Sequence, residues 1–140
     1  MAAPKLTVET LVAAPIAKVW SCYTTPADIV QWNAASDDWH TTKAEVDLRK
    51  GGAFSSRMEA KDGSFGFDFA GTYTHVAEHE AIAYEFGDRA AEVEFESTPL
   101  GIVVRVTFDP ETVHPLEQQQ SGWQAILDNF KRYVETQFGA

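Results

Sequence analysis

Ionisable side chains that could share a proton come together at Asp37, Asp38 and His40. An imidazole titrates near neutral pH, so beside a carboxylate it can take a proton from a bound molecule or return one. The alternative is a solvated polar loop from which only Trp39 enters the core. We expect the polar loop, assign no catalytic residue, and keep these three side chains as the candidates for acid/base chemistry.

A shared metal ion is the second chemistry open to the same three side chains. A divalent ion would need further ligands, and the sequence offers none beside them. The remaining histidines, His75, His79 and His114, stand at no metal-ligand spacing from one another or from Cys22. We therefore expect no metal and no cofactor.

Neither a catalytic serine nor a reactive cysteine is indicated. The stretch Gly63-Ser64-Phe65-Gly66 falls one residue short of Gly-x-Ser-x-Gly and lies in a predicted hairpin turn. Cys22 lies beside Tyr23 in a helical stretch, where a buried and inert thiol is expected. These residue types leave the question of an enzyme open and favour a protein without catalysis.

Large apolar side chains give a stronger signal than the ionisable ones. In the segments that alternate like strands they occupy every second position, which gives a sheet one apolar face. Rings of this size either pack into a solid core or leave an irregular gap that a ligand can fill, and we expect the gap. The side chains on this face are Phe54, Met58, Phe65, Phe67, Phe69, Tyr73, Tyr84 and Phe86.

A long amphipathic helix is predicted from about Pro115 to Phe138. Its apolar side chains recur at the three-and-four spacing that places them on one face. Trp123 and Phe130, seven positions apart, share one stripe, and we expect both to face the sheet. The full stripe is Trp123, Ile126, Leu127, Phe130, Tyr133, Val134 and Phe138.

A ligand cavity is therefore predicted between the apolar face of the sheet and this helix. Two tyrosine hydroxyls could turn inward, and aromatic side chains from the segment before the sheet would lie at the entrance. The predicted cavity residues are Trp32, Trp39, His40, Phe54, Met58, Phe67, Phe69, Tyr73, Tyr84, Phe86, Trp123 and Leu127.

The order of elements supports this arrangement. One strand and two short helices precede a loop and six further strands, with Gly71 expected to mark a bulge in the longest strand. This order predicts an α+β helix-grip fold, in which a curved antiparallel sheet wraps around the long C-terminal helix. The predicted segments are strand Leu6–Val12, helices Pro15–Tyr23 and Pro26–Trp32, loop Asn33–Thr42, and strands Lys43–Arg49, Ala53–Ala60, Phe65–Val76, Ile82–Phe86, Glu92–Ser97 and Ile102–Phe108.

Composition narrows the class of protein and its partners. The 140 residues are 44% hydrophobic, which suits a single domain spanning residues 1–140. A net charge of −10 argues against binding to nucleic acid or to an anionic membrane surface. The N-terminal stretch lacks a signal-peptide core, and no apolar run reaches membrane-spanning length, so a cytoplasmic protein is expected.

Several short motifs, taken in order, resemble a known family. Together they cover about Thr7 to Val134 and are similar to the SRPBCC (START-like) superfamily, and within it to the activator of heat-shock protein 90 ATPase homologue-like family. The resemblance implies a helix-grip fold with a deep hydrophobic cavity. The motifs are Ala14-Pro15 through Val19-Trp20, Trp32, Asp47-Leu48-Arg49-Lys50-Gly51-Gly52, Asp62-Gly63, Gly71-Thr72-Tyr73 and Gly122-Trp123.

The resemblance alone does not select one function, because the superfamily includes small-molecule binders, cyclases, sacrificial resistance proteins and co-chaperone domains. We expect a small-molecule-binding protein whose cavity takes an apolar or ring-containing ligand. One alternative is a co-chaperone-like interaction module, with a chaperone or a second copy of the chain as partner. Another is a cyclase- or hydrolase-like enzyme that uses His40 with Asp37 or Asp38.

Overall fold

The computed structural model describes residues 5–138. Seven strands form one antiparallel sheet whose spatial order places the first strand beside the last. Along the chain the elements are β1 (Leu6–Val12), α1 (Ile16–Thr24), α2 (Pro26–Trp32), β2 (Trp39–Val46), β3 (Ala53–Ala60), β4 (Gly66–Ala77), β5 (Ala81–Phe86), β6 (Arg89–Thr98), β7 (Gly101–Phe108) and α3 (Leu116–Phe138).

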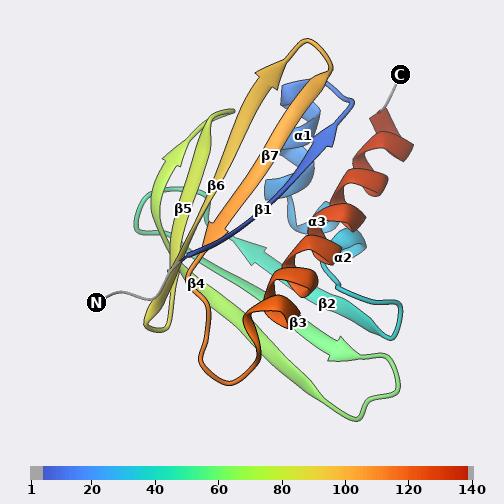
Figure 1. Ribbon diagram of the computed structural model, residues 1–140, viewed down its shortest axis with the longest axis vertical. Helices are drawn as coiled ribbons and strands as arrows, with labels where there is room; N and C mark the ends of the chain where they lie inside the picture. Colours follow the sequence, from blue (N-terminus) through green and yellow to red (C-terminus); the bar gives the residue numbers. More distant parts are fainter. Residues whose placement is uncertain (1–4, 139–140) are drawn as a thin grey trace.

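The sheet runs in the order β1-β7-β6-β5-β4-β3-β2 and curls around α3 (Figure 1). Helices α1 and α2 lie beside the C-terminal half of α3, at one end of the concave face. This arrangement confirms the predicted helix-grip fold. No helix within residues 5–138 is long and apolar enough to span a membrane.

Side chains of α3 hydrogen-bond to the free edge of β1. The amide of Gln120 donates to the carbonyl oxygen of Thr7 at 3.1 Å. One turn later, the amide of Gln124 donates to the carbonyl oxygen of Glu9, also at 3.1 Å. Four helical residues rise about 6 Å and two strand residues about 6.6 Å, so the two repeats nearly match and the pattern can continue.

The same pattern continues into the C-terminal half of α3. The ammonium group of Lys131 donates to the carbonyl oxygen of Leu11 at 2.6 Å. The carboxylate of Glu135 accepts from the backbone N–H of Ala13 at 2.9 Å, and it also pairs with Lys131 at 2.7 Å. These α3–β1 hydrogen bonds cover an edge that would otherwise be open to pairing with another strand.

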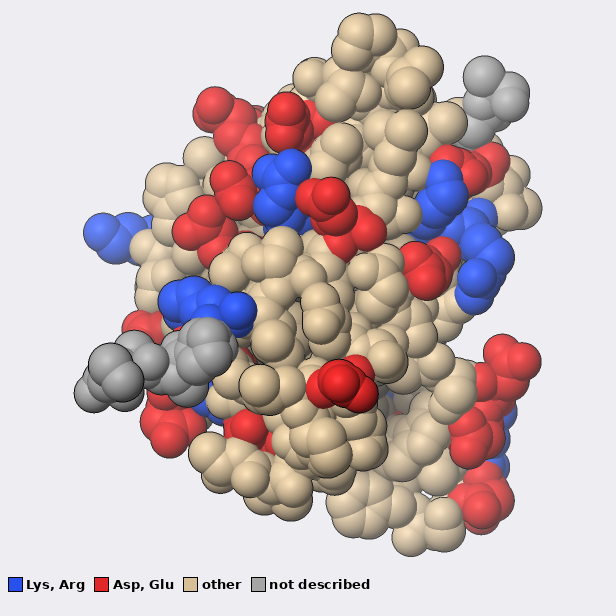
Figure 2. All heavy atoms as spheres, in the orientation of Figure 1, with Lys and Arg blue, Asp and Glu red and all other residues tan. Residues whose placement is uncertain are grey.

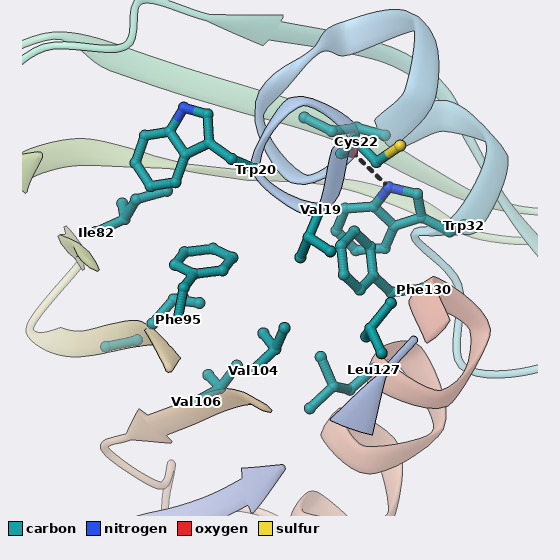
Figure 3. Close-up of a cluster of buried hydrophobic side chains, with 14 of the residues drawn as sticks. Val19, Trp20, Cys22, Trp32, Ile82, Phe95, Val104, Val106, Leu127 and Phe130 are labelled. Atoms are coloured by element: carbon teal, nitrogen blue, oxygen red, sulfur yellow. Dashed lines mark hydrogen bonds between the residues drawn. The ribbon is translucent and has the colours of Figure 1, made fainter. Parts of the chain in front are cut away.

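The core is formed where α3 meets the two short helices and the central strands. Phe130 is fully buried, and its ring lies 4.9 Å from that of Trp32 and 5.1 Å from that of Tyr23. The indole N–H of Trp32 donates to the carbonyl oxygen of Cys22 at 2.9 Å (Figure 3). Trp123, nearer the start of α3, stacks on Phe108 of β7 with ring centres 3.9 Å apart. Trp123 therefore faces the sheet as predicted, whereas the ring contacts of Phe130 come from α1 and α2.

Strand β2 begins at Trp39, so the predicted loop ending at Thr42 is wrong. Trp39 and Thr41 lie on the concave side of the strand, and the Thr41 hydroxyl donates to the carbonyl oxygen of Asn33 at 2.6 Å. A register shift at Thr42 then moves the inward positions by one residue, to Ala44 and Val46. This bulge breaks the period-two alternation, which is why the first half of the strand resembles a loop in the sequence.

Two expectations for β4 also need correction. The strand starts at Gly66, so Phe65 lies in the preceding turn with 62% of its surface exposed instead of facing the core. The bulge falls at Thr74, three residues beyond Gly71. Gly71 has a different role, because an added Cβ there would lie 2.1 Å from the Glu85 carbonyl oxygen and 2.9 Å from the Phe54 ring.

Candidate ligand-binding cavity

A cavity of about 530 Å³ lies between the concave face of the sheet and α3. Strands β2 to β5 supply one wall, α1 and α2 close one end, and the first four turns of α3 form the opposite wall. Nine aromatic side chains border it, and they are Tyr23, Trp32, Trp39, Phe54, Phe67, Phe69, Tyr73, Tyr84 and Trp123.

Ten of the twelve side chains predicted for the cavity lie in its wall. They reach it because Phe54 and Met58 alternate inward on β3, as do Phe67 and Phe69 on β4. The other six are Trp32, Trp39, Tyr73, Tyr84, Trp123 and Leu127.

Phe86 does not border the cavity, although it is buried and points inward on β5. Its ring lies 5.1 Å from Phe69 and 6.1 Å from Trp123, so it supports the two wall residues from behind. The guanidinium of Arg89 lies 4.6 Å from the centre of the same ring and makes a cation–π contact with it.

His40, which was also a candidate for acid/base chemistry, is the second exception. It lies within β2 opposite Glu59, on the side of the strand away from Trp39 and Thr41, and it does not border the cavity. Asp37 and Asp38 are exposed in the turn before the strand. None of the three side chains borders the cavity, and His40 is turned outward because the strand begins before it.

A polar end of the cavity was missed in the sequence. Arg89 borders it because β6 begins at this residue, three positions before the predicted Glu92. Glu111 and His114 border it from the loop ahead of α3, and the His114 ring nitrogen Nδ1 lies 3.1 Å from Oε2 of Glu111. The backbone N–H of His114 also donates to this carboxylate, which lowers the pKa of Glu111 below its usual value.

Gln119 fixes this loop against the first turn of α3. Its buried side-chain oxygen accepts from the backbone N–H of Glu111 at 2.8 Å, and its amide donates to the His114 carbonyl oxygen at 2.8 Å. A signal for it was present, because Gln119 lies four residues before Trp123 on the apolar stripe of the helix. A polar side chain on such a stripe indicates a buried hydrogen-bonded group.

The mouth of the cavity lies between the start of α3 and the β3–β4 hairpin. The wall residues that are exposed lie here, with Ala35 and Ser36 in the turn before β2, Phe67 on β4, and His114 and Gln118 at the start of α3. Figure 2 shows the surface hollowed between the first turns of α3 and this hairpin. A molecule could enter here without unfolding any strand.

Three tyrosines contribute phenol hydroxyls to the mostly apolar wall, which also contains the buried Ser56 of β3. Burial is the main cause that raises the pKa of Tyr73 to about 12, and it also raises the pKa of Tyr23 and of Tyr84 well above the usual value. All three phenols are therefore neutral at physiological pH. Each can donate a hydrogen bond and none carries a charge.

No metal-binding group was found in the described part of the chain. Within residues 5–138, no three His, Cys, Asp or Glu side chains are grouped so that they could hold an ion. The thiol of Cys22 is buried, and burial is the main cause that raises its pKa to about 11, so it is protonated at neutral pH.

Known proteins share both the sequence pattern and the fold. The model of the family described as "Activator of Hsp90 ATPase homolog 1-like protein" matches residues 13–135. The chain is 50% identical to a protein from Aeromonas hydrophila described as AHSA1-like, with a TM-score of 0.89, over 95% of this chain and 93% of the other. No curated protein matches it.

Two further solved structures extend the comparison. A protein from Cytophaga hutchinsonii is 46% identical, with a TM-score of 0.82, over 95% of this chain and 93% of the other. The protein NE0264 from Nitrosomonas europaea is only 20% identical but has a TM-score of 0.83, over 96% of each chain. At that level of identity the similarity concerns the fold alone.

Proposed function

We propose that this chain, which belongs to the family of Activator of Hsp90 ATPase homolog 1-like proteins, binds an apolar, ring-containing small molecule between its sheet and α3. The observation that carries the proposal is the cavity of about 530 Å³ with its aromatic wall. Pockets for small organic ligands commonly have volumes of about 300–1,000 Å³ and are mostly apolar. A packing defect in a core would be far smaller.

The arrangement of the rings supports a ligand that itself contains a ring. Phe54, Phe69 and Tyr84 surround one part of the cavity with ring centres 5.0–6.4 Å apart, in tilted and edge-on orientations. Trp123 faces them from α3, 6.3 Å from Phe69. Rings in these orientations offer both faces and edges, which are the two surfaces that a flat aromatic molecule contacts favourably.

Gly122 of α3 provides a direct test of the proposal. It borders the cavity, and a Cβ added there would have no atom within 4 Å. Gly122→Leu should therefore place its side chain in ligand space while improving the helix by about 0.5–1 kcal/mol. The binding of Nile red, a neutral dye whose fluorescence rises in apolar surroundings, should weaken by about tenfold or more through steric overlap.

Ser121→Leu is the matched control, because Ser121 is the neighbouring position on α3 and is exposed. This variant should bind Nile red as the wild-type protein does, with saturable one-to-one binding. Equal affinity in the Gly122→Leu variant would show that the dye binds elsewhere on the molecule. An absence of saturable binding to the wild-type protein would contradict the proposed function itself.

A further inference from the structure

Three tyrosine side chains enter the cavity from three different elements. Tyr73 of β4 and Tyr84 of β5 are direct partners across the sheet, and both point to the concave face. The Phe54 ring lies 5.1 Å from that of Tyr73 and 5.0 Å from that of Tyr84. Tyr23 reaches the same space from the last turn of α1.

The hydroxyls of these tyrosines open onto the cavity. Among residues 5–138, none of the three has a hydrogen-bond partner, and yet no fully enclosed side-chain nitrogen or oxygen lacks one. Each of the three hydroxyls therefore keeps some accessible surface, and all three tyrosines border the cavity. Tyr133 is the contrast, because its hydroxyl donates to Asp28 outside the cavity wall.

The three phenols also lie close enough to affect one another. A charge on Tyr73 would raise the pKa of Tyr23, and charges on Tyr23 and Tyr73 would raise the pKa of Tyr84. Burial is the larger cause in each case, and it would disfavour an anionic group of a ligand for the same reason. The positive charge of Arg89 lowers the pKa of Tyr84, but this effect is smaller than that of burial.

We infer that Tyr23, Tyr73 and Tyr84 form a donor cluster that binds a neutral oxygen acceptor, such as a carbonyl group, on a ring-containing ligand. This inference rests on the proposed function, because it concerns the polar group of the molecule that the cavity holds. A ligand without an acceptor would leave the three hydroxyls without hydrogen-bond partners in an apolar space, which is unfavourable. The cluster thus selects among ligands of similar shape.

A pair of probes that differ only in the acceptor tests the inference. Fluorenone and fluorene share a rigid three-ring frame, and the ketone of the first is a methylene group in the second. Wild-type protein should bind fluorenone about 3- to 10-fold more tightly, which corresponds to one hydrogen bond of ordinary strength. The triple variant Tyr23→Phe, Tyr73→Phe, Tyr84→Phe keeps every ring and should bind the two probes equally.

Tyr133→Phe is the control for loss of a hydroxyl outside the cavity and should keep the wild-type preference. A thermal melt of each variant verifies that it is folded before titration. Equal binding of the two probes by the wild-type protein, or an unchanged preference in the triple variant, would overturn the inference while leaving the proposed function intact. If neither probe bound to the wild-type protein, the proposed function and the inference would both fail.

Discussion

Phe130 anchors the position at which α3 meets the two short helices. The side chain is fully buried, and its ring touches those of Tyr23 and Trp32 edge-on. Trp32 also borders the cavity, at the end that α1 and α2 close. Packing at this one residue therefore determines where the end wall of the cavity lies.

Replacement of Phe130 by Ala should reduce the free energy of unfolding by about 3–5 kcal/mol, because it removes a buried ring and leaves a void. Urea denaturation followed by circular dichroism measures the loss. Phe138→Ala is the control on the same helix, since Phe138 is 39% exposed, and it should cost less than about 1 kcal/mol. A similarly small loss for Phe130→Ala would contradict its burial.

The inward position of a cavity residue was predictable where the alternation of the strand was regular. It was not predictable where the position depended on how the strand pairs with its neighbour. Phe54, Met58 and Phe69 follow a simple period of two, so their inward orientation follows from the sequence. His40 was misassigned because the start of β2 is determined by its hydrogen bonds to β3, which the sequence does not display. The inward position of Arg89 likewise depends on its pairing with Phe86.

At the scale of elements, one of the side chains that hydrogen-bond α3 to the chain at the end of β1 is a titratable carboxylate, Glu135. Glu135 accepts from the backbone N–H of Ala13 and from Lys131, and the first of these is the larger cause that lowers its pKa. A carboxyl group whose pKa is lower in the folded than in the unfolded state stabilises the fold above its unfolded pKa. That stabilisation is lost as the pH falls through the folded pKa.

We therefore expect Glu135→Gln to be less stable than wild type at pH 7 and to lose less stability below about pH 4.5, the ordinary pKa of the group. Urea denaturation at a series of pH values from 7 to about 3 measures the difference between the two curves. Glu85→Gln, at an exposed position on β5, is the control and should follow wild type. Parallel curves for Glu135→Gln and wild type would show that this hydrogen bond does not stabilise the fold.

The elements themselves were largely predictable, and their irregularities were not. Apolar periods of two and of three-to-four residues were sufficient for the strands, for α3 and for the helix-grip order. The bulges at Thr42 and Thr74 each shift the inward-outward alternation by one residue. Threonine is common in regular strands, so its presence at these positions does not indicate a bulge. Gly71 suggested a bulge, but the close approach of the Glu85 carbonyl oxygen, and then of the Phe54 ring, explains why a glycine is needed there.

At the scale of the whole molecule, acidic side chains outnumber basic ones, and within residues 5–138 they form no group that could hold a metal ion. The chain has 21 acidic and 11 basic residues, and acidic side chains are spread over the face seen in Figure 2. Within residues 5–138, ion pairs such as that of Arg105 with Glu9 and Glu96 lie on exposed surface. Pairs of this kind contribute little to stability.

Stability should consequently be independent of divalent ions. Chelation with EDTA is expected to leave the melting temperature unchanged, because a bound ion would stabilise only the folded state and its removal would lower the midpoint. Differential scanning fluorimetry with and without the chelator measures this. A fall of several degrees that one specific divalent ion reverses would overturn the expectation.

The hydrogen bonds between α3 and β1 join residues that are 113 to 122 positions apart, and the partners in β1 and β7 are 90 to 102 positions apart. During synthesis, β1 leaves the ribosome before β7 and α3, which follow about 100 residues later. At a synthesis rate of about 5–20 residues per second, β1, with its apolar Val8 and Val12, remains unpaired for about 5–20 s. A nascent chain of this fold thus exposes an unpaired apolar strand until its final helix emerges.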